Sequence, residues 1–209
     1  MSEKECGHHA DKRRKIIRRI FAGLLIFLFL VLLAVLIIWA VLQPKKPSFT
    51  LEDATLFTFN LSAPNILTSV FQITVKSHNP NDHIGVYYDN LDAYAVYRYQ
   101  QITLPTSIPP TYQDTDQFNI WSPFLYGYNV PISPDIGASL NTDRGNGNVQ
   151  LSIRMDGRVR WKVGVFVTGS YRIHVYCLAF ITFGSASTGV MVGNDAVKYQ
   201  MNWGCSVSV

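Results

Sequence analysis

Several signatures of chemistry are absent from this sequence of 209 residues. No G-x-S-x-G segment, which presents the nucleophile of α/β-hydrolases, occurs in it. The run 143–148 lacks the spaced carboxylates and closing glutamate of a calcium loop, and Cys6 with His8 and His9 supplies too few ligands for a zinc site. His174 falls within an alternating segment, where a structural role is expected. We therefore predict a protein that is not an enzyme and that holds no cofactor or metal.

Charge is missing altogether from residues 20–42, a run of 23 residues with neither charged nor amide side chains. As an α-helix it would be about 34 Å long, enough to cross a hydrocarbon core of about 30 Å. The run is longer than the apolar part of a cleaved secretory signal, and it is followed by Gln43, Pro44 and two lysines rather than by a small-residue cleavage site. A soluble helix is rarely apolar on every face over this length. The run thus predicts an uncleaved transmembrane helix.

Basic residues flank this helix unequally, with six in the residues 12–19 just before it and two, Lys45 and Lys46, after it. The excess places residues 1–19 in the cytosol as a basic tail, which we expect to be disordered, and the rest of the chain across the membrane. Beyond the helix basic and acidic residues cancel, so the formal net charge of +4 belongs to the tail. Such a tail favours anionic lipid of the inner leaflet over nucleic acid. The predicted headgroup contacts are Lys12, Arg13, Arg14, Lys15, Arg18 and Arg19.

Cysteine is scarce, with three in the chain. Cys6 lies on the cytosolic tail, where it is a weak candidate for acylation. Cys177 and Cys205 lie beyond the helix, where an oxidising lumen would let them close a loop of about 28 residues that stabilises the fold by roughly 3.5 kcal/mol. Two free buried thiols are the alternative. On the same side, Asn60-Leu61-Ser62 is the one sequon of the chain, and Asn60 is a candidate for N-glycosylation.

Beyond the helix we predict a linker over 43–54 and one domain over 55–209, long enough for a single sizeable core. Apolar and polar residues alternate in it as in half-buried strands. The residues 79–82, NPND, have the composition of a turn that stops a strand. The first two predicted strand faces are Phe57, Phe59 and Leu61, and then Phe71, Ile73 and Val75.

The clearest alternation, in residues 149–167, predicts a hairpin with its tip at Asp156-Gly157, a dipeptide suited to tight hairpin turns. Further strands are predicted over 171–180 and 197–203. Ser133 and Pro134 predict a short capped helix that ends near Leu140 and is followed by a loop over 141–148. The whole pattern is mainly β: a single N-terminal transmembrane helix followed by an antiparallel β-sandwich.

A basic stripe, Arg158, Arg160 and Lys162, lies on the outer face of this predicted hairpin, opposite Trp161 and the valines. It could be a docking surface for an acidic partner, namely pectic polysaccharide, lipid headgroup or protein. The alternative, which we favour, is a solvated face whose charges satisfy nearby carboxylates or resist edge pairing. In the NPND segment, Asn79, Asn81 and Asp82 either contact a ligand or hold the turn by bonding their own backbone.

The motifs that follow the basic tail and its single anchor occur in a fixed order. They are NPN at 79–81, GVYYD at 85–89, Trp121-Ser122-Pro123 leading to Val130-Pro131, RVRWKVG at 158–164 and the strand over 171–177. In this set the chain resembles the plant harpin-induced-like and disease-resistance-like membrane proteins, which carry a late embryogenesis abundant group 2 domain. The resemblance implies a fibronectin-like or immunoglobulin-like sandwich facing the apoplast or a lumen, and it implies no catalytic residues.

The resemblance also implies a role in plant defence or abiotic stress responses at the plasma membrane. Our first hypothesis is a non-enzymatic interaction protein, single-pass with its N-terminus in the cytosol, whose outer domain meets protein or cell-wall partners. The second is a structural tether, or a lipid- or cell-wall-binding protein that protects the membrane without signalling. Because Arg13-Arg14 near the N-terminus could retain such an anchor, the endoplasmic reticulum membrane is the alternative location.

Overall fold

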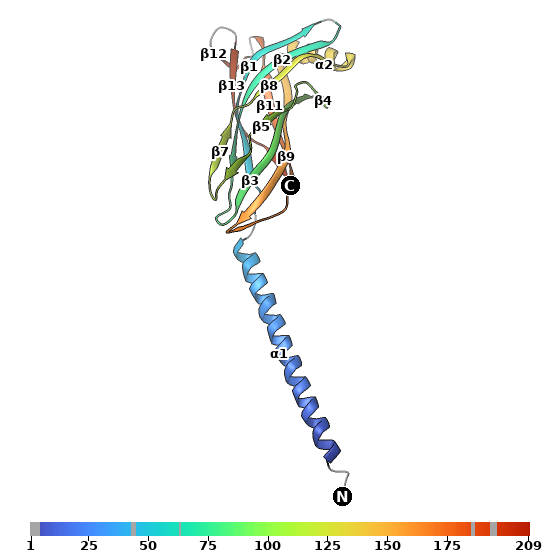
Figure 1. Cartoon of the computed structure of the whole chain (residues 1–209). Coiled ribbons are helices and arrows are strands. Elements are labelled where there is room, and N and C mark those ends of the chain that lie inside the picture. The colour runs from blue at the N-terminus through green and yellow to red at the C-terminus, as the bar shows by residue number, and fades with distance from the viewer. Residues whose placement is uncertain (1–4, 43–44, 63, 185–186, 193–195) are drawn as a thin grey trace. The chain divides into compact units, whose positions relative to one another are not determined.

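The computed structural model describes residues 5–42, 45–62, 64–184, 187–192 and 196–209. The chain divides into two compact units, Met1–Gln43 and Pro44–Val209. The first holds the helix α1, Glu5–Leu42, and the second holds all the strands and a short helix, α2, Pro134–Gly145. Figure 1 shows the elements with their labels.

The helix α1 contains a segment, Ile16–Ile37, whose length and mean hydropathy of 3.3 allow it to cross a membrane. The helix begins at Glu5 rather than near residue 20, so the expectation of a disordered tail was wrong. Lys, Arg and Ala are good helix formers, and extending a formed helix adds one hydrogen bond per residue without a new nucleation step. The basic tail therefore continues the apolar helix.

The second unit is a sandwich of two antiparallel sheets, as the alternation predicted. The first sheet has the order β12-β13-β1-β2-β7, with β8 also paired to β2. Its strands are β1 Ser48–Ser62, β2 Ile66–His78, β7 Phe118–Trp121, β8 Phe124–Pro131, β12 Val190–Val192 and β13 Ala196–Gly204.

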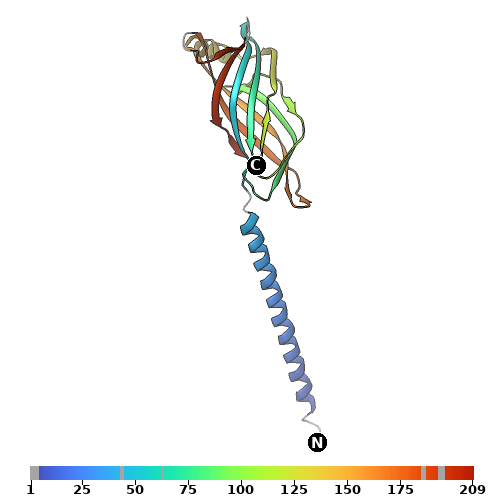
Figure 2. The same ribbon diagram turned by 90° about the vertical axis from the view of Figure 1, so that its left-hand side faces the viewer.

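The second sheet has the order β14-β11-β9-β3-β4, with β10 paired to β9 and with β5 and β6 paired to β3. In Figure 2 the first sheet faces the viewer and the second sheet lies behind it. The strands are β3 Gly85–Tyr97, β4 Gln100–Gln101, β5 Thr106–Ile108, β6 Thr111–Gln113, β9 Asn148–Val163, β10 Phe166–Val167, β11 Tyr171–Thr182 and β14 Ser206–Ser208.

The core lies between the sheets and is rich in aromatic rings at one end. Phe49 stacks on Trp121 with ring centroids 6.2 Å apart, and Tyr88 meets Trp121 edge-on at 5.3 Å. The hydroxyl of Tyr88 is hydrogen-bonded to Ser77 and donates to Gln113, and burial raises the pKa of Tyr88. The buried polar side chains of this cluster therefore have partners.

The predicted strand faces are correct for β2 and partly wrong for β1. Phe71, Ile73 and Val75 are buried, as expected. In β1, however, an irregularity between Leu56 and Thr58 shifts the register, so that Leu56 is buried and Phe57 is exposed. A bulge interrupts the alternation at this point, and nothing in the period-two pattern marks it. Beyond the bulge, Phe59 and Leu61 pack against the core as predicted. β1 also begins at Ser48, so the predicted linker over 43–54 contains the start of this strand.

The predicted hairpin tip at Asp156-Gly157 was wrong, because β9 runs through it as one strand of 16 residues. On the partner strand β3 the register shifts between Tyr88 and Asn90, and a Cβ at Gly157 would collide with the backbone oxygen of Asn90. Glycine is needed at 157 for this close approach rather than for a turn. The chain turns instead at Gly164, with φ of +58°, where Val163 pairs with Phe166.

The helix α2 is capped as predicted but is longer. Ser133 accepts a hydrogen bond from the backbone N–H of Ile136, and Pro134 occupies the first turn. The helix continues to Gly145, into the predicted loop 141–148, because Asp143 is held from outside the helix: it accepts hydrogen bonds from the hydroxyl of Tyr97 and from the guanidinium of Arg98. Tertiary contacts thus extend the helix beyond Leu140, where the local sequence predicted its end.

The disulfide Cys177–Cys205 is formed, with Cα atoms 4.4 Å apart, which confirms the pairing over two free thiols. Cys177 lies on β11 in the second sheet, and Cys205 lies between β13 of the first sheet and β14 of the second. The backbone N–H of Cys205 donates to the carbonyl of Phe49 at 2.8 Å. The disulfide therefore fixes the point where the chain passes from the first sheet to the second.

Replacement of Gly157 tests the account of β9. We expect Gly157→Ala to lower the free energy of unfolding by about 3 kcal/mol, because the added methyl group separates β3 from β9. Gly145→Ala is the control, since a Cβ at Gly145 meets nothing within 4 Å, and it should be neutral or slightly stabilising. Urea unfolding of the detergent-solubilised chain, followed by tryptophan fluorescence, measures both; equal stabilities for the two variants would contradict the close approach.

Candidate interaction surfaces of the sandwich

The outer face of the second sheet carries most of the charge near β9. Odd-numbered residues of this strand, such as Ile153, Met155 and Val159, are buried, so the even-numbered ones point outward. We call five cations on β9 and β11 the basic face. They are Arg154, Arg158, Arg160, Lys162 and Arg172.

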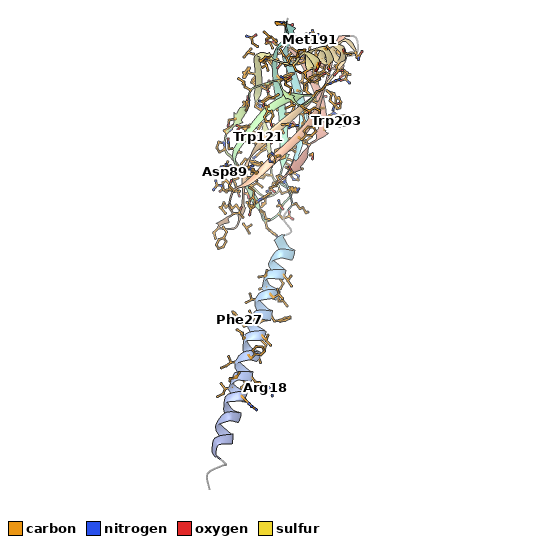
Figure 3. All side chains as sticks on the ribbon, turned by 90° about the vertical axis from the view of Figure 1, so that its right-hand side faces the viewer. Arg18, Phe27, Asp89, Trp121, Met191 and Trp203 are labelled. Carbon is orange, nitrogen blue, oxygen red and sulfur yellow. A yellow bond between two sulfur atoms is a disulfide. The ribbon has the colours of Figure 1, made fainter. Side chains whose placement is uncertain are left out.

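Arg160, the middle of the predicted stripe, has a carboxylate partner on β3. Its Nε and Nη2 donate to the two oxygens of Asp89 at 2.7 and 2.6 Å, and its guanidinium lies 5.4 Å from the ring centroid of Tyr87. The hydrogen bonds to Asp89, labelled in Figure 3, raise the pKa of Arg160. This bidentate geometry satisfies the guanidinium within the protein. At this position the arrangement is that of a satisfied surface charge.

Arg158 and Arg172 are arranged differently, because they are direct cross-strand partners on β9 and β11. Both are exposed, and within the described chain neither has a carboxylate oxygen within 4.0 Å. On its other side Arg158 faces Asn90, a neutral residue. Like charges directly opposite each other destabilise a sheet. The pair therefore forms a local concentration of positive charge that the fold leaves uncompensated.

Arg154 lies between two hollows of about 280 and 270 Å³, both also lined by Tyr176. Its guanidinium is 5.9 Å from the ring centroid of Tyr176, and its Nε is buried without a hydrogen-bond partner in the described part of the chain. Arg154 thus extends the basic face past the predicted stripe, toward α2.

Asp156 organises the polar centre of the face. It accepts a hydrogen bond from the hydroxyl of Tyr94, and it is joined to Nδ1 of His174 at 2.6 Å. Burial raises the pKa of Tyr94, and the hydrogen bond to Asp156 raises it further. Ser208 is the cross-strand partner of His174, but in the described residues no serine hydroxyl is hydrogen-bonded to this histidine. The contact of His174 is a surface hydrogen bond to a carboxylate.

A second exposed surface, which the sequence reasoning missed, is a row of aromatic rings on the first sheet. Phe57 lies 5.6 Å from Phe124, Phe124 lies 5.8 Å from Tyr126, and Tyr126 lies 5.9 Å from Tyr128, between ring centroids. We call these four residues the aromatic row; each is more than a third exposed. The signal was present in the alternation of 124, 126 and 128, but only the bulge in β1 brings Phe57 to them. Clustered exposed apolar side chains of this kind mark interaction sites.

The NPND segment holds the turn and also the start of the domain. The amide of Asn79 donates to the carbonyls of Ile84 and Asp114 at 2.7 and 3.0 Å. Asn81 exchanges two hydrogen bonds with the backbone of Lys45: its Nδ2 donates to the carbonyl at 2.8 Å, and its Oδ1 accepts from the N–H at 2.7 Å. Both asparagines are buried. Their contacts are those of residues that hold the turn. Asn81 also holds Lys45, which lies 36 residues earlier in the chain.

The remaining predicted residues are exposed where they are described. Asn60 points to solvent on β1, a position that a glycan could occupy. Arg14, Arg18 and Arg19 are exposed on α1. The side chains of Cys6, Lys12, Arg13 and Lys15 lie outside the described part of the structure.

Comparison with known proteins agrees with the fold and the motifs. The family model described as "Late embryogenesis abundant protein" matches residues 74–177. NDR1/HIN1-like protein 1 of Arabidopsis thaliana is 59% identical over 99% of this chain and 100% of its own length. NDR1/HIN1-like protein 12 is 50% identical over the whole of both chains, and protein 26 is 41% identical over 80% of this chain and 76% of its own. A solved chain from Archaeoglobus fulgidus matches 64% of this chain and 98% of its own length, with a TM-score of 0.32 and 11% identity.

Asn81 supplies a prediction about the start of the domain. Asn81→Ala removes both hydrogen bonds to Lys45 and leaves Asn79 with one fewer partner, so we expect a loss of about 2–3 kcal/mol in unfolding free energy. For a domain of this size that lowers Tm by about 5–10 °C. Asn141→Ala, at an exposed position of α2, should change Tm little. We call the two hydrogen bonds between Asn81 and Lys45 the Asn81 clamp. Differential scanning fluorimetry of the solubilised chain compares the two variants. A Tm for Asn81→Ala equal to that of the control would show that the clamp does not stabilise the domain.

Proposed function

The chain belongs to the NDR1/HIN1-like family, and on that premise we propose that it is a membrane-anchored, non-enzymatic interaction protein of plant defence or abiotic stress responses. In this proposal α1 crosses the plasma membrane with its N-terminus in the cytosol, and the sandwich faces the cell wall. The six basic residues before the apolar segment support this orientation.

One observation carries the proposal: the facing, unpaired cations Arg158 and Arg172. A sheet that needed only stability would place a carboxylate or neutral residue at one of these positions. An acidic partner would relieve the repulsion and would be steered by the remaining cations of the basic face. A polymer with regularly spaced carboxylates, such as pectic polysaccharide, suits a flat sheet surface on which outward residues recur about every 6.6 Å along a strand.

A structural tether without signalling is the second candidate, and the aromatic row favours it. Its exposed rings form a continuous apolar strip on the sheet opposite the basic face. A molecule with interaction surfaces on both sheets could hold wall material to the membrane by adhesion alone. The two candidates differ in whether the cytosolic tail is needed.

The basic face is tested by Arg158→Gln with Arg172→Gln. We expect binding of polygalacturonate to the full chain, in nanodiscs of zwitterionic lipid, to weaken about tenfold, the equivalent of about 1.4 kcal/mol for two exposed charges. Tm should stay the same or rise, because the repulsion between the two arginines is removed. Biolayer interferometry gives the dissociation constants.

The matched control removes the same charge elsewhere, with Lys46→Gln and Arg144→Gln, both at exposed positions off the basic face. It should bind polygalacturonate as the unmodified chain does. An equal loss in both double variants would reduce the effect to net charge, and retained binding in the arginine variant would contradict the assignment of this surface.

Signalling is tested by deleting residues 2–11, which leaves the six basic residues and α1's apolar segment in place. Expressed in leaf tissue, this variant should lose the defence or stress output of the full chain and keep its polygalacturonate binding. An unchanged output after the deletion would leave the tether as the better function.

The location of the domain is tested through the glycan at Asn60. A gel shift on glycosidase treatment that is lost in Asn60→Gln indicates a domain in the lumen or outside the cell. Resistance of that glycan to a high-mannose-specific enzyme indicates the plasma membrane rather than the endoplasmic reticulum.

A further inference from the structure

The turn between β9 and β10 presents apolar side chains to solvent. The exposed fraction is 89% for Val165, 78% for Phe166 and 44% for Val167. We call these three residues the apolar tip. Their neighbours on β9 that face inward, such as Val159, fill the core, whereas the tip contributes little to it. Core packing therefore gives no reason for hydrophobic residues at this apex, where turns are usually polar.

The tip is held in a defined conformation rather than hanging from a loose loop. Val163 pairs with Phe166 across the turn, and Lys162 pairs with Val167. Just below, the N–H of Thr168 donates to the carbonyl of Trp161 at 2.8 Å, and the N–H of Trp161 donates to the hydroxyl of Thr168 at 3.0 Å. In Figure 2 this hairpin, in orange, projects at one end of the sandwich. A fixed ribbon loses little further conformational entropy when its apex is buried by a partner.

The tip lies at the end of the sandwich where the chain enters it. Lys162, two residues before Gly164, pairs with Gly85, which directly follows the turn that contains Asn81. Asn81 in turn binds the backbone of Lys45. Only Gln43 and Pro44 separate Lys45 from Leu42, the last residue of α1, so the extended chain between them spans at most about 11 Å. The covalent chain alone therefore keeps Lys45, at this end of the domain, no more than about 11 Å from the last residue of α1.

The charges next to the tip suit the surface of a bilayer. Lys162 lies beside it on β9, and Lys45 and Lys46 are exposed at the same end. Lysine ammonium groups at that level would meet lipid phosphates, while the apolar side chains reach the acyl boundary. Arg158, at six residues before Gly164, is about 20 Å away along the strand, so the facing arginines stay clear of the bilayer.

From this arrangement we propose that the apolar tip inserts into the leaflet on the sandwich side of the membrane that α1 crosses. The tip is a second, non-covalent point of attachment, and with the Asn81 clamp it sets which end of the sandwich lies on the lipid. The inference rests on the membrane anchor of the proposed function. Its partner is the bilayer itself, recognised by apolar burial and by phosphate contacts of the adjacent lysines.

The test attaches an environment-sensitive nitrobenzoxadiazole probe to the thiol introduced by Val165→Cys, in a Cys6→Ser background that leaves the disulfide-bonded pair as the other cysteines. The full chain is reconstituted in vesicles of phosphatidylcholine with one fifth phosphatidylserine. We expect blue-shifted emission and quenching by spin labels on the lipid acyl chains. The same probe introduced through Tyr99→Cys, at a position 97% exposed in the β3–β4 turn at the other end of β3, should emit as in water and escape quenching.

Phe166→Asp, added to the Val165→Cys variant, separates insertion from mere nearness to the membrane. The substitution lies at an exposed position, so it should leave Tm unchanged while the acyl-chain quenching at 165 is lost. A probe at 165 that is quenched no more than the probe at 99, or that is quenched equally with and without Phe166→Asp, would overturn the inference. Failure of the chain to float with the vesicles would instead contradict the anchor on which it rests.

Discussion

The exchange of hydrogen bonds between Asn81 and the backbone of Lys45 fixes where the sandwich begins. It joins the first residues of the domain to the turn between β2 and β3, and Asn79 ties that turn to Ile84 and to Asp114 further along the chain. Since β1 and β2 pair along their whole length from this point, the register of the first sheet starts from the clamp. The second fixed point is Cys205, where the chain passes from one sheet to the other. Between them these two constraints orient the sheets at the end where the chain enters.

The two outer faces of the sandwich differ in chemistry because their strands differ in neighbours. On the second sheet β9 lies between β3 and β11, and carboxylates stand among the five cations of the basic face; Asp89 neutralises Arg160, and Asp156 is engaged by Tyr94 and His174. On the first sheet the outward positions near β8 are aromatic. A protein with a charged face and an aromatic face can engage two unlike partners at once, which suits a role in adhesion or assembly better than a single binding cleft would.

Sequence patterning predicted what depends on local period and composition. The apolar segment of α1, the faces of β2, the cap of α2 at Ser133 and the antiparallel sandwich all follow from side-chain alternation or from capping chemistry. The predictions failed where a distant strand decides the outcome. The local sequence around Gly157 is typical of a turn. Only the bulge in β3 shows that glycine is needed there because the backbone of β3 approaches it closely. The bulge in β1 likewise turns Phe57 outward, although alternation alone had placed it on the core face with Phe59 and Leu61.

The candidate site was predicted in part for the same reason. Arg158, Arg160 and Lys162 could be read from one strand, but the outcome for each depends on its cross-strand partner. Arg160 meets Asp89, whereas Arg158 meets Arg172, and the pairing that decides this joins residues on two different strands. The disulfide was within reach of the sequence because the two cysteines that follow the apolar segment, Cys177 and Cys205, allow a single pairing.

The disulfide also bears on what a single cleavage of the backbone would do to the domain. It encloses β12 and β13, the last strands of the first sheet, in a covalent loop between residues 177 and 205. A protease that cuts the backbone once within this loop would leave the C-terminal fragment attached to β11 through sulfur, and β13 would keep its ladder with β1. A molecule cleaved in this way stays in one piece until the disulfide is reduced. In an oxidising space that contains proteases, a single cleavage in this stretch would therefore not release the outer strands of the first sheet.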